Sequence, residues 1–197
     1  MYQLQAFIIS CFISSLAFGA TIPAESFRVE KFDLAQQETS VEFLAVGKPS
    51  LLKINGTGGK LVGQIEIEGG KISGEFKVAL NALTTGVDLR DKHMKEKYLE
   101  TGKFPEATFT ISKINLPVDF VAQKKLFSKV PFEGKMKIKG SEKDIQGLAD
   151  VDSSSSDIVA KTEFKAQLST FQIEIPSYLG IKVADEVTIL TSMKLKR

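Results

Sequence analysis

The sequence is poor in the residues that many enzymes use for chemistry. Its 197 residues include one cysteine, one histidine and no tryptophan. This scarcity excludes metal sites built from several His and Cys ligands. It also excludes a Cys/His nucleophile pair if the N-terminal segment that contains Cys11 is removed from the mature protein. The glycines of Gly56–Gly59 fall between predicted strands and lack the lysine of a phosphate-binding loop. We therefore predict no catalytic residues, no metal site and no cofactor, and a protein that is not an enzyme.

The sequence also lacks a strong excess of charge. Lys and Arg number 26 and Asp and Glu 24, which leaves a formal net charge of +2. This is too little to indicate a nucleic-acid partner, and the lysines alternate with apolar residues as on a solvated strand face. With 43% apolar and 25% charged residues, the composition is that of an ordinary globular protein. We predict one folded domain.

The first residues are typical of an export signal. Ala6 to Phe18 is almost entirely apolar or small, which is the length of a signal-peptide core and too short to span a bilayer comfortably. Ala17 and Gly19 offer the small residues that a signal peptidase reads. We predict a signal peptide over residues 1–19, cleavage before Ala20, and a periplasmic or secreted protein.

The only cysteine leaves an alternative for this segment. Ile8-Ile9-Ser10-Cys11 resembles a lipobox, in which Cys11 would be lipidated. The apolar run continues past Cys11 to Phe18, which favours ordinary cleavage. The mature protein would then contain no cysteine, and so no disulfide or thiolate ligand.

Most of the remaining chain alternates between apolar and polar residues with the period of a β-strand. The clearest hairpin joins Lys60–Glu68 to Lys71–Leu80 through Gly69-Gly70. We read 20–39 as a lead-in, Gly47–Gly59 as a connection and Asp152–Asp157 as a polar loop. About eight strands result, which is the size of a closed barrel able to hold one small ligand. The expected fold is mainly β, an eight-stranded antiparallel barrel domain over 40–197.

The alternation assigns one face of each strand to the interior. The predicted inward residues are Phe43, Ile65, Ile67, Phe76, Val78, Leu80, Phe109, Ile111, Met136, Ile138, Phe164, Ala166, Leu168, Phe171 and Ile189. This face reads as wholly apolar. Patterning alone favours a barrel that fills its own core.

One segment departs from the strand period. Apolar residues recur at helical spacing between Thr84 and Pro105, with Gly102 placed to end a helix. We predict a single short helix at about Leu89–Glu100, inserted between two strands. Arg90, Asp91 and His93 are assigned to structure, with Arg90 and Asp91 as an ion pair at the start of the helix.

Several motifs in this segment and after it resemble the YceI-like family, whose members are periplasmic polyisoprenoid-binding proteins with a lipocalin-like barrel. The matching motifs are Thr85-Gly86, Arg90-Asp91-x-His93-Met94, Tyr98-Leu99, Phe104-Pro105-x-x-Thr108-Phe109, Gly134-x-Met136-x-Ile138-x-Gly140 and Thr170-Phe171-Gln172-Ile173. Together with the closing strand from Val183, the resemblance covers about Ser40 to Leu195. The polar Asp152–Asp157 segment departs from the longer, aromatic segment of many members.

The resemblance implies an apolar lumen lined by the inward residues. It also implies an amphiphilic isoprenoid ligand, of polyprenyl phosphate or quinone type, that is carried or sequestered in the periplasm. The predicted partners are therefore an isoprenoid or other long-chain apolar ligand and no nucleic acid, with transient membrane contact and a homodimer as further options. The alternative is a secreted stress-response or interaction module with a filled core and no ligand.

Overall fold

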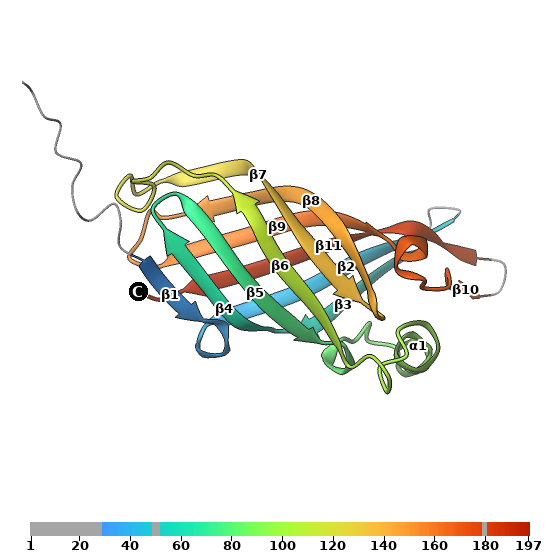
Figure 1. Cartoon of the computed structure of the whole chain (residues 1–197). Helices are drawn as coiled ribbons and strands as arrows, with labels where there is room; N and C mark the ends of the chain where they lie inside the picture. The colour runs from blue at the N-terminus through green and yellow to red at the C-terminus, as the bar shows by residue number, and fades with distance from the viewer. Residues whose placement is uncertain (1–28, 49–51, 179–180) are drawn as a thin grey trace, which may run out of the picture.

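In the computed structural model, which describes residues 29–48, 52–178 and 181–197, the chain forms one curled antiparallel sheet (Figure 1). The predicted signal peptide with Cys11, and residues 20–28 of the predicted lead-in, lie outside the described residues. Within the described residues, no helix has the length and hydropathy needed to cross a bilayer.

The strands occupy most of the described chain. They are β1 (Val29–Asp33), β2 (Glu38–Lys48), β3 (Lys53–Gly59), β4 (Leu61–Glu68), β5 (Lys71–Ala79), β6 (Glu106–Ile114), β7 (Leu126–Ile138), β8 (Ser141–Asp152), β9 (Ile158–Gln167), β10 (Ser177–Tyr178) and β11 (Ile181–Leu195). Short helical elements connect some of them. These are η2 (Leu34–Gln36), η3 (Leu80–Ala82), α1 (Asp88–His93), η4 (Met94–Tyr98) and η5 (Leu168–Phe171).

The strands follow the order β1-β4-β5-β6-β7-β8-β9-β11-β2-β3, and β10 pairs with β11. Side chains connect strands near the beginning of this order to strands near its end. The Thr39 hydroxyl in β2 accepts a hydrogen bond from the Leu61 amide of β4 over 3.0 Å and donates to the Leu61 carbonyl over 3.3 Å. The Arg197 guanidinium binds the Glu30 carboxylate of β1 with bonds of 2.6 and 3.0 Å. The sheet therefore encloses an interior, which we call the lumen.

The mainly β fold with one short inserted helix is confirmed, but the predicted number of eight strands is wrong. The described residues contain an eleven-stranded sheet. The largest omission is β3, which the Asn55-Gly56 and Gly58-Gly59 pairs led us to interpret as a connection. Residues 29–33 and 38–39 of the predicted lead-in also join the sheet, as β1 and the beginning of β2.

A tertiary contact explains the glycine in β3. A Cβ atom at Gly56 would lie 1.9 Å from the ring of Phe43 on the neighbouring strand, so only glycine lets this ring pack over β3. The glycine reflects the close approach of a side chain, and not a turn.

The helix begins at Asp88 and continues through α1 into η4, whose last residue is Tyr98. It ends slightly before the predicted Glu100. Met94 and Tyr98 pack against the core and Leu99 is buried, whereas Leu89 is 57% exposed. The helical spacing therefore identified the face that packs, except at its first position.

The two ends of the curled sheet differ in what covers them (Figure 1). The helix end, as we call it, carries α1, η4, η5 and the turn between β7 and β8. The loop end carries residues 115–125, the turn between β4 and β5, and the end of β11. Most of the fully buried side chains belong to segments at the loop end: Leu34, Phe120, Val151, Ser153, Ile158 and Leu195.

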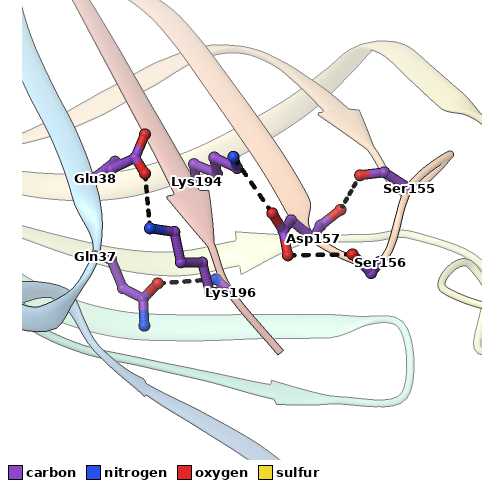
Figure 2. A network of polar contacts seen from close by, with 7 residues as sticks. All are labelled: Gln37, Glu38, Ser155, Ser156, Asp157, Lys194 and Lys196. Carbon is purple, nitrogen blue, oxygen red and sulfur yellow. Dashed lines mark hydrogen bonds and ion pairs between the residues drawn. The ribbon is translucent and has the colours of Figure 1, made fainter.

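A network of polar contacts ties the outer surface of the loop end together (Figure 2). The Lys196 amide donates to the Gln37 side-chain oxygen over 2.8 Å, and the Lys196 ammonium lies 2.7 Å from the Glu38 carboxylate. The hydrogen bond from the Lys196 ammonium to Glu38, together with the charge of Lys196, lowers the pKa of the Glu38 carboxyl. Lys194 meets Asp157 at 3.4 Å, which connects β11 to the loop before β9. Because these groups are exposed, the network positions segments more than it stabilises the fold.

Candidate functional site: an apolar lumen

The predicted lining residues all belong to the main apolar cluster or pack against it. Most are buried, but Phe43, Phe109, Ile138, Leu168 and Ile189 remain partly exposed. Leu80 lies in η3 and Leu168 in η5, so these two are not strand residues as predicted. Phe171 also lies in η5. The structure thus brings the predicted residues together in one interior.

Phenylalanine rings meet across the middle of the lumen. Phe109 of β6 stacks on Phe76 of β5, with ring centroids 4.8 Å apart. It also contacts Phe164 of β9 at 5.3 Å and Phe132 of β7 at 6.2 Å, and these two rings lie 6.1 Å apart. Such edge and stacked contacts add to the free energy gained by burying the rings.

Gly147 makes part of this ring cluster possible. It lies in β8 directly between Phe132 of β7 and Phe164 of β9 in the strand register. A Cβ atom there would lie 2.7 Å from an atom of each of these residues, which is closer than real Cβ atoms approach. The missing side chain leaves room for the two rings to meet.

The interior is not wholly apolar, which corrects the prediction. Thr162 of β9 faces Thr191 of β11, and their hydroxyl oxygens lie 2.8 Å apart in a hydrogen bond. Thr191 is buried beside Val41 in the register. The two hydroxyls satisfy one another, so the surrounding surface remains suited to hydrocarbon.

At the helix end, Asp91 and Arg90 hold the loop before α1. The Asp91 carboxylate accepts hydrogen bonds from both the hydroxyl and the amide of Thr85, and from the hydroxyl of Thr84. Arg90 donates to the Thr85 hydroxyl over 2.8 Å and to its carbonyl over 2.9 Å. Arg90 and Asp91 therefore act through Thr85, and the described contacts include no ion pair between them. His93 is exposed.

The pKa of Asp91 reflects this binding. Partial burial alone would raise the pKa of the carboxyl, but the hydrogen bonds from Thr84 and Thr85 outweigh it and lower the pKa below 3.8. A carboxylate that accepts several hydrogen bonds is stabilised in its charged form. Asp91 is thus a charged anchor for a loop.

A second contact fixes the turn between β7 and β8 to the end of the helical segment. Lys139 and Glu100 form an ion pair at 2.5 Å, in which the lysine side chain is only 15% exposed. This hydrogen bond lowers the pKa of the Glu100 carboxyl. The Phe104 ring lies beneath Gly140 of the same turn. These contacts hold the covering segment at the rim of the lumen.

One hollow lies where β8 and β9 separate near the helix end. Pairing of these strands stops at Gly147 and Phe164, and η5 contacts both β8 and β11 beyond this point. The hollow has a volume of about 340 Å³, with Lys143, Lys165 and Glu186 around it and the buried Ala166 and Phe171 among its lining residues. Among the described residues, no cluster of His, Cys, Asp or Glu could hold a metal ion.

Two residues that shape the loop end were not among the predicted residues. Phe120 is fully buried at 0% exposure and contacts the ring of Phe127. The hydroxyl of Ser153, 1% exposed, donates to the Phe120 carbonyl over 2.8 Å. The apolar residues Leu116 and Val121 near Phe120 could have indicated a segment that covers the core. The run of serines that includes Ser153 instead favoured a solvated loop.

These features define a class of protein: a curled antiparallel barrel around an apolar interior, with a short helical segment at one rim. The chain belongs to the family described as YceI-like domain, whose model matches residues 32–195. No sequence among the curated proteins matches the chain.

Solved structures share the fold at low sequence identity. The chain is similar to BcnA of Burkholderia cenocepacia, with a TM-score of 0.67 and 20% identity over 84% of this chain and 99% of that one. It is also similar to a polyisoprenoid-binding domain from Saccharophagus degradans, with a TM-score of 0.58 and 16% identity over 86% and 98%. The YCEI protein of Campylobacter jejuni gives a TM-score of 0.60 and 17% identity over 75% and 86%.

Proposed function

We propose that the protein binds an amphiphilic isoprenoid lipid, of polyprenyl phosphate or quinone type, in its lumen and carries or sequesters it in the periplasm. The observation that carries this proposal is the set of inward apolar side chains that stay partly exposed, such as Phe43, Phe109 and Ile189. Membership of the YceI-like family and the similarity to a polyisoprenoid-binding domain support it. Transient membrane contact and a homodimer remain predictions.

The magnitude of apolar burial makes such binding reasonable. An isoprene unit has five carbons, so its full burial contributes on the order of 3–4 kcal/mol. A few buried units would exceed an association cost of several kcal/mol. The tail therefore need not be wholly enclosed, and the head group can stay at the rim.

Lipid extraction tests the proposal. The exported protein is purified without detergent, and an organic extract is analysed by mass spectrometry against an extract of a heat-unfolded sample that was washed before extraction. We expect an isoprenoid lipid in near-stoichiometric amount from the folded protein. A clean extract, together with no uptake of added prenol, would contradict the proposal.

The ring contacts between Phe76, Phe109 and Phe164 favour a second candidate, an interaction module with a filled core. Ala166→Phe separates the two because Ala166 lies on the inward face of β9. With a ligand-holding lumen, the variant keeps its stability and loses lipid. In a filled core, the added ring lowers the free energy of unfolding by about 1–3 kcal/mol.

We also propose export to the periplasm, on the sequence of residues 1–19. N-terminal sequencing of the exported protein should find a chain that begins near Ala20. A lipid-modified terminus at Cys11 would contradict this and indicate a lipoprotein.

A further inference from the structure

We propose that the ring cluster of Phe76, Phe109, Phe132 and Phe164 is the floor of the binding site and limits the length of the isoprenoid tail that the lumen accepts. This inference rests on the proposed function. It divides the lumen into a helix-end compartment that takes the tail and a loop-end core that is filled by the protein.

The position of the rings places the floor at a definite depth. Phe109 is three residues from the helix-end terminus of β6, and Phe164 is three residues from that of β9. At about 3.3 Å per residue, the floor lies roughly 10 Å inside the rim along either strand. Their contact at 5.3 Å spans from one strand to the other across the lumen.

Side-chain size changes at this level. The next inward residues toward the helix end are Ala107 on β6 and Ala166 on β9, two residues from Phe109 and Phe164 respectively. Two small side chains thus stand above two large rings. On these two strands the inward side chains are therefore smaller just above the floor than at it, which favours a hydrocarbon tail there.

Burial distinguishes Phe109 from the other three rings of the cluster. Phe109 is the one member of the cluster that is partly exposed, whereas Phe76, Phe132 and Phe164 are each 2–3% exposed. Beyond these rings, the loop end holds the fully buried side chains of Phe120, Val151 and other residues. A tail that enters at the helix end therefore meets Phe109 first and finds no room beyond it.

The test uses geraniol, farnesol and geranylgeraniol, which differ by one isoprene unit each, with dissociation constants measured by isothermal titration. For the natural protein, we expect affinity to rise with tail length and then to level off. Phe109→Ala frees about the volume of one isoprene unit. In this variant, affinity should therefore level off at a tail one isoprene unit longer. The first prenol beyond the limit of the natural protein should bind the variant about tenfold more tightly, or more, than it binds the natural protein.

Phe127→Ala is the matched control, because Phe127 is also a partly buried phenylalanine in the apolar cluster but lies at the loop end. It should leave the dependence on tail length unchanged. Phe109→Leu keeps most of the packing and provides a milder variant if Phe109→Ala unfolds; it should shift the limit in the same direction by a smaller factor.

The outcomes separate the floor from the proposed function. Affinity that rises over the whole series, with the same slope in Phe109→Ala and Phe109→Leu, would overturn the floor and keep prenol binding. Absence of prenol binding by the natural protein would overturn both. A limit that moves equally in Phe127→Ala would also overturn the floor, since the loop end would then be part of the site.

Discussion

The loop end and the helix end of the barrel are covered in different ways. At the loop end, residues 115–125 bury Phe120 completely and Ser153 binds its carbonyl. At the helix end, α1 and η4 are held at the rim by contacts such as Lys139 to Glu100, and lumen residues such as Ile138 and Leu168 stay partly exposed. Complete packing stabilises a fold, whereas incomplete packing leaves apolar surface for something else to cover.

The helix end also contains a separate, smaller apolar cluster. Ala45, Ile54, Val183 and Val187 form it, and Phe43 and Leu168 pack against both this cluster and the main one. Two of the partly exposed lumen residues thus lie at the junction of two packed units. The comparison teaches that, for Phe43 and Leu168, partial exposure occurs where two packed units meet.

The largest effect is expected from truncation at the loop end. Phe120→Ala removes a fully buried ring and should lower the free energy of unfolding by about 3–5 kcal/mol. Chemical denaturation followed by circular dichroism measures the change. Leu126→Ala, at an exposed position nearby, is the control and should change stability little. A small effect of Phe120→Ala would mean that the loop end is as loosely packed as the helix end.

Ser153→Ala tests the polar contact that holds the same cover. It leaves the buried Phe120 carbonyl without its donor at 2.8 Å, which should lower the free energy of unfolding by about 1–3 kcal/mol. Hydrogen exchange should speed up in residues 115–125 and stay unchanged in residues 84–104. Ser128→Ala, an exposed serine on β7, serves as the control. Equal acceleration at both ends would contradict the distinction between them.

Phe43→Ala makes the matching change at the helix end. Because Phe43 is partly exposed, the loss should be only about 1–2 kcal/mol, below that of Phe120→Ala. Retention of extracted lipid should nevertheless fall severalfold, whereas Phe120→Ala should retain lipid at temperatures where it is folded. If the stability effects of the two variants were reversed, our assignment of the two ends would be wrong.

The smallest effect concerns Asp91, and it depends on pH. Since hydrogen bonds hold its folded-state pKa below 3.8, its contribution is fully present above pH 3.8 and is lost as the pH falls through the folded-state value. Asp91→Asn should lower stability by about 0.5–2 kcal/mol at pH 7, by analogy with the loss of a cap. The difference from the natural protein should shrink below pH 3.8 in denaturation series. A difference that is constant with pH would rule out the carboxylate charge as its cause.

Sequence alternation predicted the interior of the long strands well, because inward and outward positions differ in polarity. Phe76 and Met136 are buried as the pattern predicts, and Lys77 and Lys137 are exposed. Alternation gave no indication, however, that β8 and β9 separate beside Ile145. Beyond this point η5 contacts both β8 and β11, and the alternating pattern gave no indication of this short helix.

Contacts between distant segments could not be predicted from one sequence. Gly56 read as a turn residue because the position of the Phe43 ring is a tertiary fact. Ser153 read as solvated because its partner, the Phe120 carbonyl, is 33 residues away. The ring cluster could not be predicted for the same reason. Alternation predicts that Phe109 and Phe164 face inward, but it does not predict that they contact one another.

The contact between Thr39 and Leu61 has a mechanical consequence. Around most of the wall, neighbouring strands are joined by continuous ladders of backbone hydrogen bonds, and stretching the wall there would break many bonds together. Between β2 and β4, the two hydrogen bonds of one threonine side chain take the place of a ladder. The girth of the barrel can therefore widen along this line at the expense of few bonds, while the strands that are paired by ladders keep their register.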